Sequence, residues 1–178
     1  MLAITSLLAS PASDHINSII KGLEKEFGLT DVQATPEPHL TYQLVDPVDL
    51  DELKHKLQAV ATTASPIVAH TTGLGMFPGD NPVIYIPVLR SDQLNQLHHR
   101  VLEVAAPLCT RTDRFSAPDL WLPHISLALH DTTPEMLGPV LRYLNNQTFN
   151  LELEIGNLTL LRPDGNLFVR EVVFEFES

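Results

Sequence analysis

Residues 123–129 read Pro-His-Ile-Ser-Leu-Ala-Leu, and residues 38–44 read Pro-His-Leu-Thr-Tyr-Gln-Leu. Each segment has a proline, a histidine, an apolar residue, a hydroxyl residue and then a further apolar run. Alternation of this kind over six or seven residues is typical of a β-strand. His39 and His124 lie nearly half of the 178-residue chain apart. The sequence therefore predicts two similar strands, one in each half.

Successive side chains of a strand point to opposite faces, so His39 should share a face with Thr41, and His124 with Ser126. The opposite, buried faces should carry Leu40, Tyr42 and Leu44 in the first strand and Ile125, Leu127 and Leu129 in the second. If the two strands lie close together, two imidazoles and two hydroxyls surround one small volume.

These four side chains suit chemistry at a phosphodiester. An imidazole exchanges a proton near neutral pH, because its unperturbed pKa is about 6.5, so two of them can act as base and acid in one turnover. Two hydroxyls can donate hydrogen bonds to oxygens that gain charge in the transition state. One Pro-His-x-Thr strand alone would be uninformative, and the repeat is what indicates a site.

The paired His-x-Thr and His-x-Ser strands resemble the two signature motifs of the 2H phosphoesterase superfamily, which includes the 2′-5′ RNA ligase-like proteins and the cyclic nucleotide phosphodiesterases. The resemblance covers the spacing of the motifs, the chain length and the order of the elements. It implies that His39 and His124 are catalytic and that Thr41 and Ser126 bind phosphate.

Two further residues are candidates for substrate contact. The Gly-rich turn, Phe77-Pro and following strand also resemble the 2H proteins, and this implies that Phe77 stacks on a base, although core packing explains a Phe equally well. By strict alternation His130 shares the face of His124, so it either lines the cleft or ends the strand in solvent.

Composition limits the class of protein. A chain of 178 residues with 44% apolar content predicts one two-lobed domain over residues 1–178. The net charge of −11 disfavours a long duplex and favours a small nucleotide or a short RNA end as partner. Arg100, Arg111 and Arg114 form either a local basic patch or a solvated face. No run approaches the roughly 20 apolar residues of a membrane span, so we expect no membrane contact.

One cysteine, Cys109, excludes an intramolecular disulfide and is consistent with a reducing compartment. The apolar start, residues 2–9, is expected to be a strand because it lacks the charged beginning of a secretory signal. We expect a cytoplasmic protein; the sequence does not fix its oligomeric state.

Hydrophobic periodicity and turn residues give the order β-α-β-α-β-β-α-β-α-β-β. The expected fold is α+β, with two pseudo-symmetric lobes of antiparallel sheet, outer helices and an active-site cleft between them. Strands are expected at 2–9, 39–45, 66–70, 83–89, 124–130, 151–161 and 167–176, and helices from about 14 to 28, 50 to 62, 93 to 106 and 132 to 145. Residues 71–79 and 109–122 should bend or form irregular links. Pro87 suggests an edge strand or a bulge.

The expected function is metal-independent phosphodiesterase chemistry on a 2′,3′-cyclic phosphate or a 2′-5′-linked ribonucleotide, with no cofactor. The sequence leaves open which histidine is the base, and whether hydrolysis or ligation is physiological. The alternative is a nucleotide- or RNA-end-binding module with the same cleft and no turnover, which the four intact motif residues disfavour. A zinc hydrolase using His39 and His124 is disfavoured because no Asp, Glu or Cys lies at ligand spacing beside either one.

Overall fold

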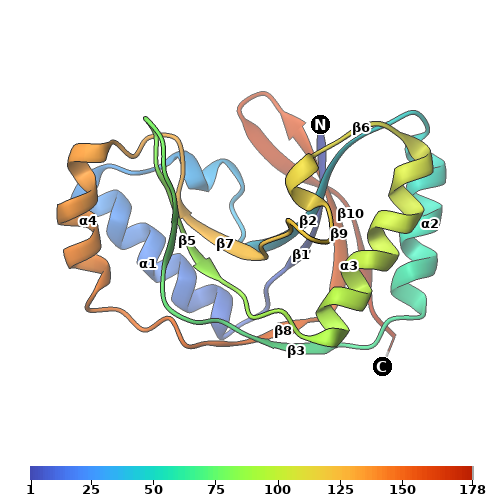
Figure 1. The fold of residues 1–178 in the computed structure, drawn as a ribbon, viewed down its shortest axis with the longest axis horizontal. Helices are drawn as coiled ribbons and strands as arrows, with labels where there is room; N and C mark the ends of the chain where they lie inside the picture. The colour runs from blue at the N-terminus through green and yellow to red at the C-terminus, as the bar shows by residue number, and fades with distance from the viewer. Residues whose placement is uncertain (178) are drawn as a thin grey trace.

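A computed structural model describes residues 1–177 (Figure 1). The helices are α1 (Ala12–Phe27), α2 (Leu50–Thr62), α3 (Asp92–Ala105) and α4 (Leu137–Leu144), with short 3₁₀ helices η1 (Asp31–Ala34), η2 (Ala106–Leu108), η3 (Arg114–Ser116) and η4 (Pro134–Met136). The strands are β1 (Leu2–Leu7), β2 (His39–Pro47), β3 (Ile67–His70), β4 (Gly75–Phe77), β5 (Val83–Pro87), β6 (Cys109–Thr112), β7 (His124–Ala128), β8 (Glu152–Ile155), β9 (Asn157–Asp164) and β10 (Leu167–Glu175).

The first lobe is a five-stranded antiparallel sheet in the order β10-β9-β1-β2-β6, so β2, the first motif strand, is internal. α2 and α3 cover this sheet, as Figure 1 shows on its right side. Both helices are amphipathic at helical spacing. Their buried residues are Leu53, Leu57, Val60 and Ala61 in α2, and Leu94, Leu97, His98, Val101 and Ala105 in α3.

The second lobe is a three-stranded antiparallel sheet in the order β4-β5-β7; α1 packs on β7, and α4 packs on α1 (Figure 1). β3 and β8 pair with each other and run between the lobes. The lobes are interleaved in sequence, because α1 from the first half packs on β7, and α3 from the second half packs on β2. One continuous hydrophobic core therefore joins both lobes.

The two motif strands carry the same irregularity at the same place. In β2, Thr41 pairs with Thr5 and Gln43 with Ile4, which leaves Tyr42 as the extra residue of a β-bulge. In β7, Ser126 pairs with Tyr85 and Ala128 with Ile84, which leaves Leu127 extra. Each bulge directly follows the hydroxyl residue of its motif. This match supports the pseudo-symmetry beyond the repeated letters.

The α+β fold with antiparallel sheets is as predicted, and several local expectations are wrong. The 71–79 stretch contains β4, and the 109–122 link contains β6. The single strand expected at 151–161 is two strands in different sheets, separated at Gly156. Pro87 lies on the central strand of its sheet and is tolerated there because it is the last residue of β5. Within residues 1–177, no helix combines the length and the apolarity needed to cross a bilayer.

Candidate active site

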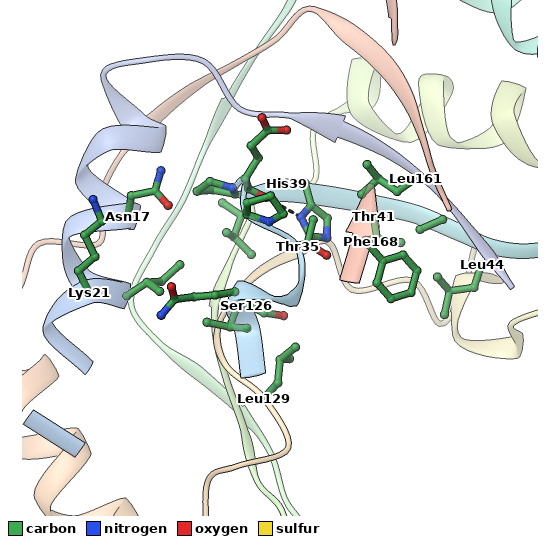
Figure 2. Close-up of a pocket in the computed structure, with 18 residues that line it drawn as sticks. Asn17, Lys21, Thr35, His39, Thr41, Leu44, Ser126, Leu129, Leu161 and Phe168 are labelled. Atoms are coloured by element: carbon green, nitrogen blue, oxygen red, sulfur yellow. Dashed lines mark hydrogen bonds between the residues drawn. The ribbon is translucent and has the colours of Figure 1, made fainter. Parts of the chain in front are cut away.

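A cavity of about 470 Å³ lies between the two motif strands (Figure 2). β2 contributes His39, Thr41 and Leu44, and β7 contributes Ser126. The remaining lining comes from Ala3 of β1, from α1, from residues 32–38, from Ile125 and Leu129 in and after β7, and from the β9–β10 hairpin. Its members include Asn17, Lys21, Gln33, Thr35, Glu37, Leu161 and Phe168. The cavity therefore draws on both lobes, and its volume is typical of a small-molecule site.

Both motif histidines are held in the same way. Nδ1 of His39 lies 2.9 Å from the carbonyl oxygen of Glu37, and Nδ1 of His124 lies 2.7 Å from that of Leu122. A carbonyl can only accept, so each Nδ1 carries the hydrogen and each Nε2 is left for the substrate. In each motif a proline separates the carbonyl from the histidine. Its fixed φ and its effect on the preceding residue restrict where that carbonyl points.

The cross-strand anchors of the two motifs also match. The N–H of Leu8 donates to the carbonyl of Pro38 at 3.0 Å, and the N–H of Val88 donates to that of Pro123 at 2.9 Å. The strand that pairs with each motif strand thus fixes the residue directly before its histidine. Equivalent backbone contacts therefore set the position of both imidazoles.

Burial controls the protonation of the pair. Burial lowers the pKa of His39 below 6.5, partly opposed by the bond to the Glu37 carbonyl, and the charge of His124 lowers it further. Burial also lowers the pKa of His124, partly opposed by the carbonyl of Leu122. The two histidines are carried by strands that contact each other, β2 and β7. Because both pKa values are lowered below 6.5, both histidines are neutral in the free protein at pH 7.

Three of the four motif side chains, His39, Thr41 and Ser126, line the cavity, and His124 is not among its lining residues. His124 instead packs against two aromatic rings. The ring of Phe77 meets it edge-on at 5.2 Å, and the ring of Tyr85 lies 5.0 Å away. Phe77 and Tyr85 stack on each other at 4.3 Å. Phe77 packs on Tyr85 and is 38% exposed, but it is not among the residues that line the cavity, so its stacking on a base stays a prediction.

The backbone of Thr41 is held by Trp121, which belongs to a stack of buried rings. Nε1 of Trp121 donates to the carbonyl of Thr41 at 3.1 Å. Trp121 lies between Tyr42, at 5.9 Å, and His98, whose ring is parallel to it at 3.8 Å. His98 is fully buried, and neither of its ring nitrogens makes a hydrogen bond of normal geometry, although the carbonyls of Ser116 and Tyr42 lie near its ring. Burial lowers the pKa of His98 to about 4.

The structure corrects three expectations near the site. Leu44 and Leu129, both expected on buried faces, line the cavity, because the bulges at Tyr42 and Leu127 reverse the alternation after them. Gln43 is buried in place of Leu44. His130 does not share the face of His124, because β7 has its own bulge and ends at Ala128. His130 is exposed, and its carbonyl accepts from Asn81.

The three arginines do not form a basic patch. Arg100 donates to the carbonyls at the end of α2, Arg111 lies 4.0 Å from Asp46, and Arg114 covers the ring of Phe115. Arg111 and Arg114 are exposed, as the alternative of a solvated face predicted, whereas Arg100 is half-buried. Among residues 1–177, no three His, Cys, Asp or Glu side chains gather as a metal ion requires.

Sequence reasoning missed several residues of the site. Lys21, Phe168 and Trp121 come from elements far from the motifs, and each looks like an ordinary surface or core residue in the sequence. Arg170 of β10 donates two hydrogen bonds to the carboxylate of Glu37, one of them from Nε to Oε2 at 2.6 Å. This ion pair connects the β9–β10 hairpin to the residues just before β2. A long-range ion pair of this kind leaves no local sequence signal.

A family model described as the 2′-5′ RNA ligase superfamily matches residues 11–167. A comparison with curated protein sequences gives no significant match. Among solved structures, Escherichia coli LigT complexed with 3′-AMP aligns with a TM-score of 0.65 at 17% identity over 100% of both chains. The protein TT0787 of Thermus thermophilus aligns at 0.63 and 18% identity, over 99% of this chain and 98% of that one. A protein described as a phosphoesterase aligns at 0.62 and 15%, with the same coverage. At these identities, the structural likeness establishes the fold.

Proposed function

Because the chain belongs to the 2′-5′ RNA ligase superfamily of 2H phosphoesterases, we propose that it is a phosphodiesterase that opens a 2′,3′-cyclic phosphate or a 2′-5′ linkage, using two histidines and no metal ion. The observation that carries the proposal is the matched geometry of the two motifs. Each presents an imidazole with its Nδ1 bonded to the carbonyl two residues before it. We further propose that the two lobes of the chain form one domain, which is supported by a cavity lined by residues of both lobes.

In the proposed hydrolysis, Nε2 of one histidine takes a proton from water, and the water oxygen forms a bond to phosphorus. The other histidine, as an imidazolium, gives its Nε2 proton to the ribose oxygen as the P–O bond breaks. The products are a ribose hydroxyl and a phosphate monoester, and the two histidines have exchanged protonation states. The Nδ1 hydrogen bonds of His39 and His124 are equivalent, so they do not distinguish the base from the acid.

The reaction needs one charged and one neutral imidazole. Burial lowers the pKa of both His39 and His124, which disfavours the charged form in the free protein. A bound phosphate carries a negative charge, and a nearby opposite charge raises the pKa of a histidine. Substrate binding therefore helps to protonate the general acid.

Thr41 and Ser126 line the cavity and are half-buried. Their hydroxyls are proposed to donate to the non-bridging oxygens, which gain charge as water attacks. Trp121 fixes the backbone of Thr41, and Tyr85 pairs with Ser126 across the sheet. A buried aromatic residue thus lies next to the backbone of each hydroxyl residue. Figure 2 shows Ser126 and Thr41 on two sides of His39.

The cavity volume of about 470 Å³ and the net charge of −11 support a small nucleotide or a short RNA end as substrate. Structures of E. coli LigT complexed with 3′-AMP and with ATP are consistent with nucleotide-sized ligands in this fold. We also propose a cytoplasmic location, with which the single cysteine is consistent.

Turnover of the four nucleoside 2′,3′-cyclic monophosphates, followed by chromatography with and without EDTA, tests this function. We expect a nucleoside monophosphate product at the same rate in both conditions. Loss of activity in EDTA that zinc restores would contradict the two-histidine mechanism. Binding of cyclic nucleotide without any product would indicate a binding module instead.

A further inference from the structure

Lys21 is distinctive among the charged residues that line the cavity. The others are His39 and Glu37, and the Glu37 carboxylate is already held by Arg170. Within residues 1–177, Lys21 makes no ion pair or side-chain hydrogen bond, whereas Lys25, one turn further along α1, approaches Glu26 at 4.0 Å. In a chain of net charge −11, the cavity therefore keeps one positive charge without a partner.

The neighbours of Lys21 are suited to an anion. Asn17 precedes it by four residues, so the two side chains lie on the same face of α1 and both line the cavity (Figure 2). The Asn17 amide has no hydrogen-bond partner among the described residues, so its two N–H donors are available. Glu24, the nearest acid along the helix, accepts from Gln33 at 2.9 Å. An ammonium and a free amide thus face the cavity together.

The two ends of the cavity differ in chemistry. Figure 2 shows Lys21 and Asn17 on one side of His39, and Phe168, Leu161 and Leu44 on the other. In a nucleoside 2′,3′-cyclic phosphate, the base on C1′ and the 5′ group on C4′ leave the ribose to either side of its ring oxygen, away from the phosphate. A substrate with its cyclic phosphate near His39 can direct its base toward Phe168 and its 5′ group toward α1.

We propose that Lys21 and Asn17 form a second anion subsite, which binds the 5′-phosphate of the terminal nucleotide. This subsite rests on the proposed function and narrows its substrate: a 5′-phosphorylated nucleotide or an RNA end, whose last nucleotide always carries that phosphate, is favoured over a free nucleoside cyclic phosphate. Phe168 supplies the apolar wall for the base at the opposite end.

Binding of unreactive ligands tests the subsite without relying on turnover. Adenosine 3′-monophosphate and adenosine 3′,5′-bisphosphate differ only in the 5′-phosphate, and calorimetry gives both dissociation constants. The variants are Lys21→Gln and, as a matched control on the same helix, Lys25→Gln. Lys21 is exposed, so neither variant should change the thermal unfolding midpoint.

We expect the wild-type protein to bind the bisphosphate about tenfold more tightly at low salt, between the worth of an exposed ion pair and that of a buried charged hydrogen bond. Lys21→Gln should remove this preference while leaving the 3′-monophosphate affinity within about twofold, and Lys25→Gln should keep it. Equal affinities for the two ligands in the wild type, or an equal loss for both in Lys21→Gln, would overturn the subsite alone. If neither ligand binds, the subsite and the nucleotide site of the proposed function both fail.

Discussion

Replacing Gly75 by alanine should displace the aromatic support of His124. Gly75 pairs with Tyr85 across β4 and β5. A Cβ at this position would lie 2.2 Å from Cε2 and 2.3 Å from Cζ of the Tyr85 ring, where ordinary contact begins near 3.4 Å. The Tyr85 ring must therefore move by at least about 1 Å, and it is buried between Phe77 and His124.

Overpacking of this kind typically costs about 1–3 kcal/mol of unfolding free energy. Since a misplacement of about 1 Å in an active site can cost about 10²-fold, we expect kcat/KM for a cyclic phosphate to fall by about 10- to 100-fold in Gly75→Ala. Denaturant unfolding gives the first quantity and initial rates give the second. Gly156→Ala is the control, because its Cβ would meet only Glu154 Oε1 at 3.8 Å.

A double-mutant cycle with Tyr85→Ala separates the clash from other effects of the substitution. In that background the added Cβ has no ring to strike, so Gly75→Ala should cost much less stability. If Gly75→Ala unfolds and turns over like the wild type, the reasoning that Tyr85 positions His124 is wrong.

Three further outcomes follow from the site. The profile of kcat/KM against pH should be bell-shaped with its maximum below pH 6.5, because burial lowers the pKa of both motif histidines and the active form carries one proton between them; a maximum above pH 7 would contradict this. Thr41→Val and Ser126→Ala should each lower kcat by about 10²-fold or more without moving either limb of that profile, since a hydroxyl only stabilises charge. A shifted limb would mean that the replaced hydroxyl takes part in proton transfer. His98 has a folded pKa of about 4 and an unfolded pKa of about 6.5, so the unfolded state binds more protons between these values and stability falls as the pH drops through that window. His98→Leu should therefore reduce the slope of unfolding free energy against pH, measured by urea unfolding, by up to about 1.4 kcal/mol per pH unit. An unchanged slope would show that His98 does not titrate in that window.

The motif strands and the four main helices could be predicted because their apolar residues recur at regular spacing. His39 and Thr41 share a face as the alternation required, and so do His124 and Ser126. Alternation failed after Tyr42 and after Leu127, because each of these residues is the extra residue of a β-bulge, which the sequence does not signal. Leu44 and Leu129 were therefore both predicted on the wrong face.

Short strands escaped prediction for another reason. β4 has three residues and β6 has four, and both depend on pairing with other strands rather than on a pattern of their own. The cavity-lining roles of Lys21 and Phe168 depend on the packing of α1 and of the β9–β10 hairpin around β2. A periodic pattern reports the burial of a residue within its own element. It does not report which other element that residue will face.

The central claim is that His39 and His124 divide the proton transfers of one reaction. Turnover of a 2′,3′-cyclic mononucleotide by His39→Ala and by His124→Ala tests it most directly, with His55→Ala, an exposed histidine of α2, as the control. Each motif substitution should lower kcat by about 10²- to 10⁴-fold, and the double variant should lose less than the product of the two because the groups act as a unit. His55→Ala should keep wild-type turnover. Near-normal turnover by either motif variant would contradict the two-histidine site.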